Sequence, residues 1–199
     1  MATFHPTDRT RLRRRPERAT SDPEAIYAIL DAGFVCHVGL VEERRPLVIP
    51  TAYARAGDAL LLHGSSRSRT LTLLAAGAEA CITVTHLDGL VLARSAFHHS
   101  INYRSVVIFG RAEPVEEPAG KLAALEAFFA RIHPGRWADV RWPNEQELRA
   151  TTVVRLPLGE VSAKVRSGGP LDDAEDLALP VWAGVVPMAL VRGEPVREG

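Results

Sequence analysis

Short apolar runs separated by tight turns occupy most of this 199-residue chain up to Val115. The runs that we interpret as strands are Phe34–Val41, Pro46–Tyr53, Ala59–His63, Glu79–Thr85, Leu90–Ala96 and Arg104–Val115. Glu42–Arg45 and Gly57–Asp58 are predicted turns, and His86–Gly89 is a predicted hairpin turn. Strands this short, joined by tight turns, favour an antiparallel barrel over a parallel nucleotide-binding sheet, and the chain has no GxGxxG motif.

Four segments carry helical signals around these strands. Ser21 and Glu24 have the spacing of a capping box, and Pro23 suits the first turn of a helix that ends near Gly33. The other predicted helices are Thr70–Ala76, the amphipathic segment Pro118–Ile132 and Asn144–Ala150. Two more strands are predicted at Thr151–Leu158 and Val161–Val165. The pattern predicts a mainly β (α+β) fold, with six or more antiparallel strands and flanking helices.

The composition suits one globular domain, because 46% of the residues are hydrophobic and 24% are charged. We expect residues 1–20 to form a basic N-terminal arm and residues 21–199 to form a single domain. The arm carries a local basic run that we expect to be solvated, namely Arg11, Arg13, Arg14, Arg15 and Arg18. After Gly168-Gly169-Pro170 the tail is acidic and then apolar, which suggests a segment that wraps the domain.

The charge balance and the cysteine content argue against several classes of function. The formal net charge is zero, so no overall field attracts nucleic acid or an acidic membrane. No apolar stretch has the ~20 residues of a membrane span, and no signal peptide is evident, so we expect a cytoplasmic protein. Cys36 and Cys81 lie in apolar runs without a second ligand at metal spacing, which predicts buried reduced thiols and no metal.

Two polar groups interrupt the apolar pattern between His63 and Gly110. The first, His63–Arg69, follows a strand and leads into a short helix, where free N–H groups and the positive end of the helix dipole favour a phosphate. Ser68 and its flanking arginines would add further donors. The second group runs from His98 to Ser105 at the entrance of a strand. Alternatively, Ser68 is an ordinary N-cap, and Tyr103–Ser105 only form cross-strand pairs.

The order of the motifs LLHGSSRSRTLTLL, FHHSINYRSVVIFGRAE, SAKVRSGGP and VWAGVVP resembles the flavin-binding split β-barrel family related to pyridoxamine 5′-phosphate oxidase. The resemblance covers roughly residues 10 to 190. Within that family the chain is most similar to the branch that contains the nitroimidazole-resistance reductases. The resemblance therefore implies an FMN-dependent oxidoreductase that acts on a small molecule, and the branch suggests the reduction of nitro compounds.

The resemblance also implies where FMN would bind. Its phosphate would lie at Ser68 and Arg69, and its ring would lie along Pro50–Tyr53. The implied cofactor-binding residues are Pro50, Thr51, Ala52, Tyr53, Leu62, His63, Gly64, Ser65, Arg67, Ser68, Arg69, Asn102, Tyr103, Arg104 and Ser105. Candidate substrate contacts are His98, His99, Lys164 and Trp182, and no catalytic residue is evident. His98 and His99 are adjacent on a strand, so they point to opposite faces.

A second class of function stays open. Members of this family hold haem or a deazaflavin, or serve as flavin-binding modules without catalysis. The family also pairs two barrels side by side, which implies a homodimer with two shared sites. A twofold pair would cover the flavin face that a barrel too narrow to enclose the ring leaves exposed. Alternatively, Trp182 packs in the core instead of binding a substrate, and a structural role is likewise open for Lys164.

Overall fold

The computed structural model describes residues 4–198, in which the chain forms two compact units. The first unit comprises the described residues up to Thr85 together with Ser105–Lys164. The second comprises His86–Arg104 and the described residues from Val165. The first three residues of the predicted arm, and Gly199, lie outside the described residues.

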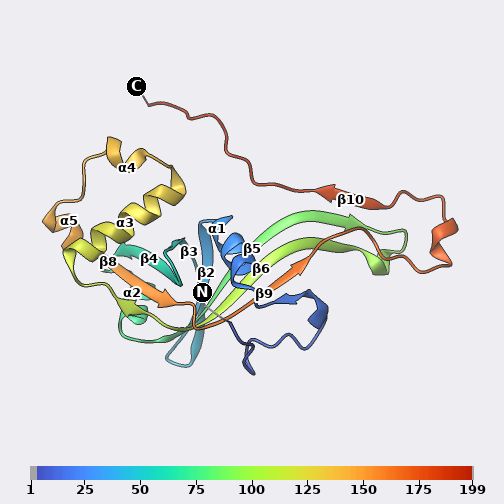
Figure 1. Ribbon diagram of the computed structural model, residues 1–199, viewed down its shortest axis with the longest axis horizontal. Coiled ribbons are helices and arrows are strands. Elements are labelled where there is room, and N and C mark those ends of the chain that lie inside the picture. Colours follow the sequence, from blue (N-terminus) through green and yellow to red (C-terminus); the bar gives the residue numbers. More distant parts are fainter. Residues whose placement is uncertain (1–3, 199) are drawn as a thin grey trace. The chain divides into compact units, whose positions relative to one another are not determined.

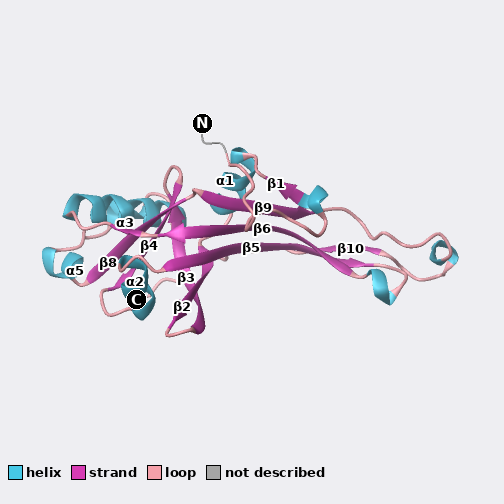
Figure 2. Cartoon of the chain, turned by 90° about the horizontal axis from the view of Figure 1, so that it is seen from below, coloured by secondary structure: helices cyan, strands magenta, loops and turns pink. Residues whose placement is uncertain are grey.

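Figure 1 and Figure 2 show the elements along the chain. The α-helices are α1 (Pro23–Asp31), α2 (Arg69–Ala75), α3 (Pro118–Ile132), α4 (Arg136–Asp139) and α5 (Glu145–Arg149). The strands are β1 (Ala19–Thr20), β2 (Val35–Glu42), β3 (Arg45–Arg55), β4 (Ala59–Ser65), β5 (Glu79–Leu92), β6 (Ser100–Arg111), β7 (Glu113–Pro114), β8 (Thr151–Pro157), β9 (Glu160–Arg166) and β10 (Gly184–Pro187). Short 3-10 turns lie at Pro16–Arg18, Ala96–His98 and Asp176–Ala178.

The strands form one curled sheet with the order β1-β9-β6-β5-β2-β3-β4-β8-β7, and β10 pairs with β5. Every pairing whose register is defined is antiparallel, for example Val38 of β2 with Ile49 of β3. The chain passes from β6 to β7 through the single residue Ala112, and β7 then pairs with β8. The sheet therefore curls back on itself, and the predicted antiparallel split β-barrel is confirmed.

Alternating apolar side chains fill the barrel. In β2, the side chains of Cys36, Val38 and Leu40 are buried, whereas those of Val35, His37 and Val41 are exposed. Four successive residues of β4, Ala59–Leu62, are all buried. Leu61 is buried on the outer side, where it packs in a small cluster with Ala124 of α3 and Val153 of β8. Helix α3 thus covers this side of the barrel, as its amphipathic pattern predicts.

Two local predictions were wrong in detail. The first helix is capped by Asp22, whose carboxylate accepts a hydrogen bond from the Ala25 N–H at 3.0 Å, and not by the predicted Ser21–Glu24 box. The second concerns His86–Gly89, which was predicted to be a hairpin turn. The structure instead has one continuous strand β5, because Gly89 pairs with Pro187 of β10 and extends the ladder. A strand added from the distant tail leaves no local signal in the sequence.

The N-terminal segment packs against the rest of the first unit. Phe4 is 6% exposed and its ring meets Tyr27 edge-on, and Thr10 is 4% exposed. The Arg9 guanidinium binds the carboxylates of both Glu79 and Glu160. Four of the five arginines of the predicted basic run are exposed as expected, namely Arg11, Arg13, Arg14 and Arg15. The segment is therefore anchored by its other residues, and the charged run faces the solvent.

Ion pairs and main-chain contacts hold the second unit together. Arg104 on β6 forms two hydrogen bonds to the Asp88 carboxylate, at 2.9 and 2.8 Å. Asp172 accepts from both the N–H and the guanidinium of Arg94, at 2.7 and 2.9 Å. The Met188 N–H donates to the Asp88 carbonyl at 3.0 Å, just beyond β10. These contacts tie the tail to residues 86–104.

Candidate functional site

The first turn of α2 carries backbone N–H groups without acceptors. Ser68 caps the helix and accepts from the Leu71 N–H at 3.4 Å, and the Thr72 N–H donates to the Ser68 carbonyl at 2.9 Å. The N–H groups of Arg69 and Thr70 have no acceptor within residues 4–198. Ser68 is therefore an ordinary N-cap, which was the alternative to phosphate binding, and two N–H groups of the first turn have no acceptor in the described chain.

Charged side chains surround this helix start. Arg69 is 65% exposed and its guanidinium contacts the Glu42 carboxylate, so a phosphate would have to compete with that ion pair. Arg67 is exposed and forms no ion pair within the described part of the chain. Ser65 accepts from the Arg67 N–H at 3.2 Å, which holds the loop before the helix. The unpaired guanidinium of Arg67 therefore lies in the same loop as the free N–H groups.

Gly64 allows α2 to pack closely on the end of β4. A Cβ at this position would lie 3.0 Å from the Leu71 side chain, closer than ordinary van der Waals contact. Leu62, which precedes it by two residues, is fully buried in the core and would reach a cofactor only through its main chain. The predicted cofactor-binding segment Leu62–Arg69 thus has a part with a structural role, up to Gly64, and a polar part from Ser65 onward.

His63 lies beneath α3. Its ring meets Phe128 edge-on, with a centroid distance of 4.3 Å and an interplanar angle of 75°. Burial lowers the pKa of the imidazole below its ordinary value of 6.5, so His63 is neutral at pH 7. Neither ring nitrogen has a hydrogen-bond partner among the described residues. Neither nitrogen is among the fully buried polar atoms without a partner, so the ring is accessible to solvent or to a ligand, and a half-buried neutral imidazole of this kind is a candidate ligand for a metal centre.

The segment Pro50–Tyr53 lies on β3 beside β2. Tyr53 is 1% exposed and its hydroxyl donates to the Leu30 carbonyl at 2.5 Å, so its side chain serves the core. Pro50 and Ala52 pair with His37 and Val35 on the outer side of the sheet. The outer side of the two strands, which we call the β2–β3 face, comprises Val35, His37, Val41, Pro46, Val48, Pro50 and Ala52. Its apolar side chains include Val41 at 68% exposure and Val48 at 61%.

The polar groups of the Asn102–Ser105 segment are largely satisfied within the chain. Asn102 donates to the Gly168 carbonyl at 3.0 Å and accepts from Arg166, and both residues are 8% exposed. Arg166 also donates to the Gly169 carbonyl at 3.3 Å. Ser105 donates to the Lys164 carbonyl at 3.3 Å. Arg104 is bound to Asp88, whereas the half-buried Tyr103 has no side-chain hydrogen bond within residues 4–198.

The candidate substrate residues are spread over several elements. In the second unit, His98 and His99 do not lie on a strand as predicted, because His98 ends the 3-10 turn Ala96–His98 and β6 begins at Ser100. His98 contacts the Asp173 carboxylate at 3.0 Å, and His99 contacts the Ser95 carbonyl through Nδ1 at 3.0 Å. Trp182 is 63% exposed in the tail, so its side chain is not in the core. Lys164 belongs to the first unit and pairs with Ala19 in the β1–β9 ladder. Sequence reasoning missed Arg94 and Arg166, because their side-chain partners Asp172 and Asn102 are distant in the chain.

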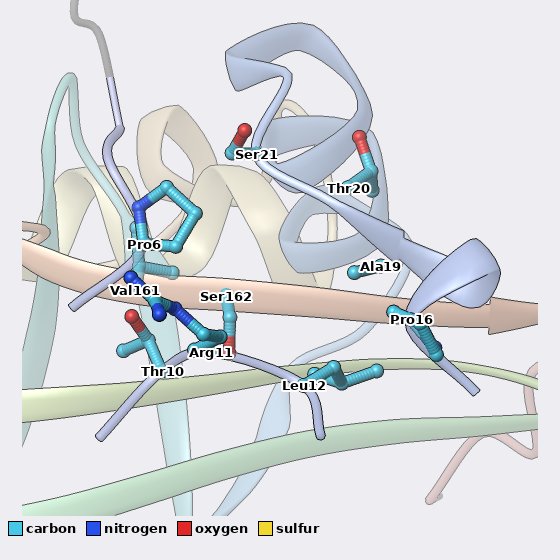
Figure 3. Close-up of a pocket in the computed structure, with 10 residues that line it drawn as sticks. All are labelled: Pro6, Thr10, Arg11, Leu12, Pro16, Ala19, Thr20, Ser21, Val161 and Ser162. Atoms are coloured by element: carbon cyan, nitrogen blue, oxygen red, sulfur yellow. The ribbon is translucent and has the colours of Figure 1, made fainter. Parts of the chain in front are cut away.

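A pocket of about 180 Å³ lies between the N-terminal segment and β9, and Figure 3 shows its lining side chains. Pro6, Thr10, Arg11, Leu12, Pro16, Ala19, Thr20, Ser21, Val161 and Ser162 line it. It is smaller than the roughly 300–1,000 Å³ of ordinary ligand pockets, so it does not fit a flavin. None of the predicted site residues lines this pocket.

Cys36 is buried as predicted, whereas Cys81 is only half-buried, and neither thiol has an evident reactive role. Burial raises the pKa of Cys36 to about 12, and it also raises the pKa of Cys81, so neither forms a thiolate near pH 7. Within residues 4–198, no three His, Cys, Asp or Glu side chains are grouped to hold a metal ion. Helices of the described chain are all too short or too polar to cross a bilayer.

The barrel, the polar start of α2 and the half-buried neutral imidazole of His63 define a split-barrel protein with a candidate cofactor site. Residues 22–165 match the pyridoxamine 5′-phosphate oxidase family, and the chain belongs to this family. No curated protein sequence matches the chain.

Three solved structures place the chain among its relatives. The flavocytochrome Anf3 from Azotobacter vinelandii is 42% identical, with a TM-score of 0.92, over 98% of this chain and 91% of that one. The FAD and heme binding protein from Mycobacterium smegmatis is 39% identical, with a TM-score of 0.88, over 91% and 89%. A putative 5-nitroimidazole antibiotic resistance protein from Bacteroides thetaiotaomicron shares the fold at 23% identity and a TM-score of 0.62, over 74% and 86%.

Proposed function

We propose that this protein is a redox protein that binds a flavin and a haem. Two relatives support the pair of cofactors, because the names of the flavocytochrome and of the FAD and heme binding protein describe both groups, at 42% and 39% identity. The observation in this chain that carries the proposal is His63, a half-buried neutral imidazole without a hydrogen-bond partner in the described chain.

The flavin phosphate would bind at the start of α2. The free N–H groups of Arg69 and Thr70, the unpaired guanidinium of Arg67 and the positive end of the helix dipole together suit a phosphate group. This group is common to FMN and FAD. The ring would lie along Pro50–Ala52 of the β2–β3 face, which presents apolar side chains and main-chain groups to an aromatic ring.

The haem would be held at His63. Neutral imidazole is the form that binds iron, and burial keeps His63 in that form at pH 7. Two of the other histidines suit this role less well. His98 and His99 are engaged by Asp173 and by the Ser95 carbonyl, respectively. When bound, the two cofactors supply hydride and single-electron chemistry, and the protein contributes binding and orientation.

A second copy of the chain would complete the site. The β2–β3 face exposes Val35, Val41 and Val48 at 46%, 68% and 61%, which leaves an apolar surface beside the proposed ring position. In a twofold pair, this surface would cover the flavin of each subunit. The homodimer with two equivalent sites therefore belongs to the proposal, as does a small-molecule partner for the reduced flavin. The expected cytoplasmic location stays a prediction.

An FMN-dependent oxidoreductase without haem is the alternative. The split-barrel fold and the proposed phosphate position at α2 are equally consistent with this alternative, which includes the nitro-compound reduction that the resemblance implies. A deazaflavin or a non-catalytic flavin module would also leave His63 without an iron to bind. These alternatives differ from the main proposal in one measurable property, which is the haem content.

Haem binding by His63→Ala tests the proposal. The full chain is produced with a supply of haem, and its Soret absorbance is compared with that of His63→Ala and of the control His133→Ala. His133 lies at the exposed C-terminal end of α3. We expect the parent and the control to hold haem and His63→Ala to lose it. Equal haem content in all three proteins would contradict the assignment of His63, and a parent without haem would contradict the proposed pair of cofactors.

A further inference from the structure

A series of aromatic rings leads from His63 to the surface of the first unit. The His63 ring is 4.3 Å from Phe128, and Phe128 is 6.1 Å from Phe129, measured between ring centroids. Phe129 and Trp137 are 5.5 Å apart. Trp137 stacks on Trp142 at 5.7 Å, with an interplanar angle of 21°. The last ring is 57% exposed, so the series reaches the solvent.

Core packing accounts for the inner end of this series but not for its outer end. Phe128 is 7% exposed and packs beneath α3 as an ordinary core side chain. Trp142 instead lies at the surface, where its Nε1–H donates to the Trp137 carbonyl at 3.3 Å. This hydrogen bond and the stacking fix two indoles in parallel where little apolar area is removed from water. Indole is also among the side chains that lose one electron most easily.

We propose that Phe128, Phe129, Trp137 and Trp142 form an electron conduit between a redox centre held at His63 and the surface. This inference rests on the proposed function, because the centre is the haem proposed for His63. If a peroxide were reduced at a haem held there, it would take up two electrons and two protons and become two water molecules. Trp137 and Trp142 would each supply one of these electrons through the phenyl rings, and each oxidised indole would release its N–H proton to the solvent. The oxidising equivalents would thus leave the site and reach the surface.

The chain contains a matched control for this route. It has three tryptophans, and the third, Trp182, is 63% exposed, close to the 57% of Trp142. Trp182 belongs to the second unit and forms no ring pair within the described residues. Direct attack by peroxide from the solvent would therefore modify Trp142 and Trp182 to a similar extent. Oxidation through the conduit would favour Trp137 and Trp142.

Mass spectrometry of peptides from the haem-loaded full chain, treated with hydrogen peroxide, tests the conduit. We expect more oxidised indole at Trp137 and Trp142 than at Trp182, and we expect this excess to be lost in the haem-free protein. Phe129→Leu interrupts the series with a side chain of similar size, and Phe129 is half-buried and distant from the iron ligand in the series. We therefore expect Phe129→Leu to keep its haem and to lose the excess. Trp137→Leu serves as a second interruption if Phe129→Leu folds poorly.

The outcomes separate the conduit from the cofactor proposal. If the parent protein holds haem but oxidises Trp142 and Trp182 equally, the conduit is wrong and the haem assignment stands. The conduit is also wrong if both interrupted variants keep haem and retain the excess at Trp142. If the parent protein holds no haem after reconstitution, the proposed function fails, and the conduit fails with it.

Discussion

At the scale of single residues, the environment of His63 makes stability depend on pH. Burial beneath α3 disfavours the imidazolium, so the folded-state pKa lies below the ordinary value of 6.5. The unfolded chain therefore binds the proton more readily. We predict that His63 lowers the free energy of unfolding as the pH falls below about 6.5, and that this effect levels off below the folded-state pKa.

Denaturant unfolding of the cofactor-free protein between pH 5 and pH 8 checks this prediction, with both pH limits chosen to bracket roughly the titration of histidine. His63→Gln removes the titrating group, so its unfolding free energy should fall less toward acid than that of the parent. Parallel pH profiles for the two proteins would show that His63 is not shielded from water as described.

Arg69 tests the phosphate position at the same scale. Its guanidinium is 65% exposed and contacts Glu42, so a phosphate must displace or share that contact. A charge-assisted hydrogen bond contributes about 1.5–3 kcal/mol, and we therefore predict that Arg69→Ala weakens flavin binding by roughly ten- to a hundredfold. Titration of the apoprotein with FMN and with FAD measures the dissociation constant of each flavin. Arg149→Ala is the control, because Arg149 is an exposed residue in α5. Equal flavin affinities in all three proteins would contradict the proposed phosphate site at Arg69.

At the scale of elements, a capping box stabilises α5. The sequence predicted this helix but not its capping box. The Asn144 side chain accepts from the Glu147 N–H at 2.9 Å, and the Glu147 carboxylate accepts from the Asn144 N–H at 2.8 Å. Arg141 also binds this carboxylate, and the two interactions lower the Glu147 pKa to about 2. We predict that Asn144→Ala lowers the free energy of unfolding by about 1 kcal/mol, which thermal or urea unfolding would measure. Asn144→Asp, which can cap the helix equally well, should stay close to the parent, and a large loss there would contradict the capping role.

The sequence predicted most elements because their signals are local. The apolar runs of β2, β3, β4 and β8, and the stripe of α3, were predicted close to their observed bounds. The errors at β5 and β10 have a common cause. The ladder that pairs β10 with β5 joins segments that are far apart in the chain, and the sequence of neither segment indicates which strand it pairs with.

The site shows the same division between local and distant information. The N-cap role of Ser68 and the helix that follows it could be read from the sequence, because both depend on neighbouring residues. The use of Asn102 and Arg104 could not, since Arg166 and Asp88 satisfy their side chains from other strands. His63 was predicted as a site residue, but its burial against Phe128 depends on how α3 folds over the barrel.

At the scale of the whole molecule, we predict a homodimer. The apolar β2–β3 face is exposed in a single chain, and a second barrel would bury it while covering the proposed flavin. Sedimentation of the cofactor-loaded protein should therefore give about twice the 21.7 kDa of the chain. Val48→Asp places a charge on this face and should shift the mass toward the monomer. Glu126→Asp, on an exposed position of α3, is the control. A parent that stays monomeric while holding its full complement of flavin would contradict the shared site.

The identity and amount of the bound cofactors test most directly whether the protein binds both a flavin and a haem. The full chain is produced with flavin precursors and haem in supply, and the bound groups are released and identified by absorbance and mass spectrometry. We predict both a flavin, as FAD or FMN, and a haem, each close to one per chain. Flavin alone would favour the FMN-dependent oxidoreductase without haem, and a protein that carries neither group would contradict the central claim that this chain is a flavin- and haem-binding redox protein.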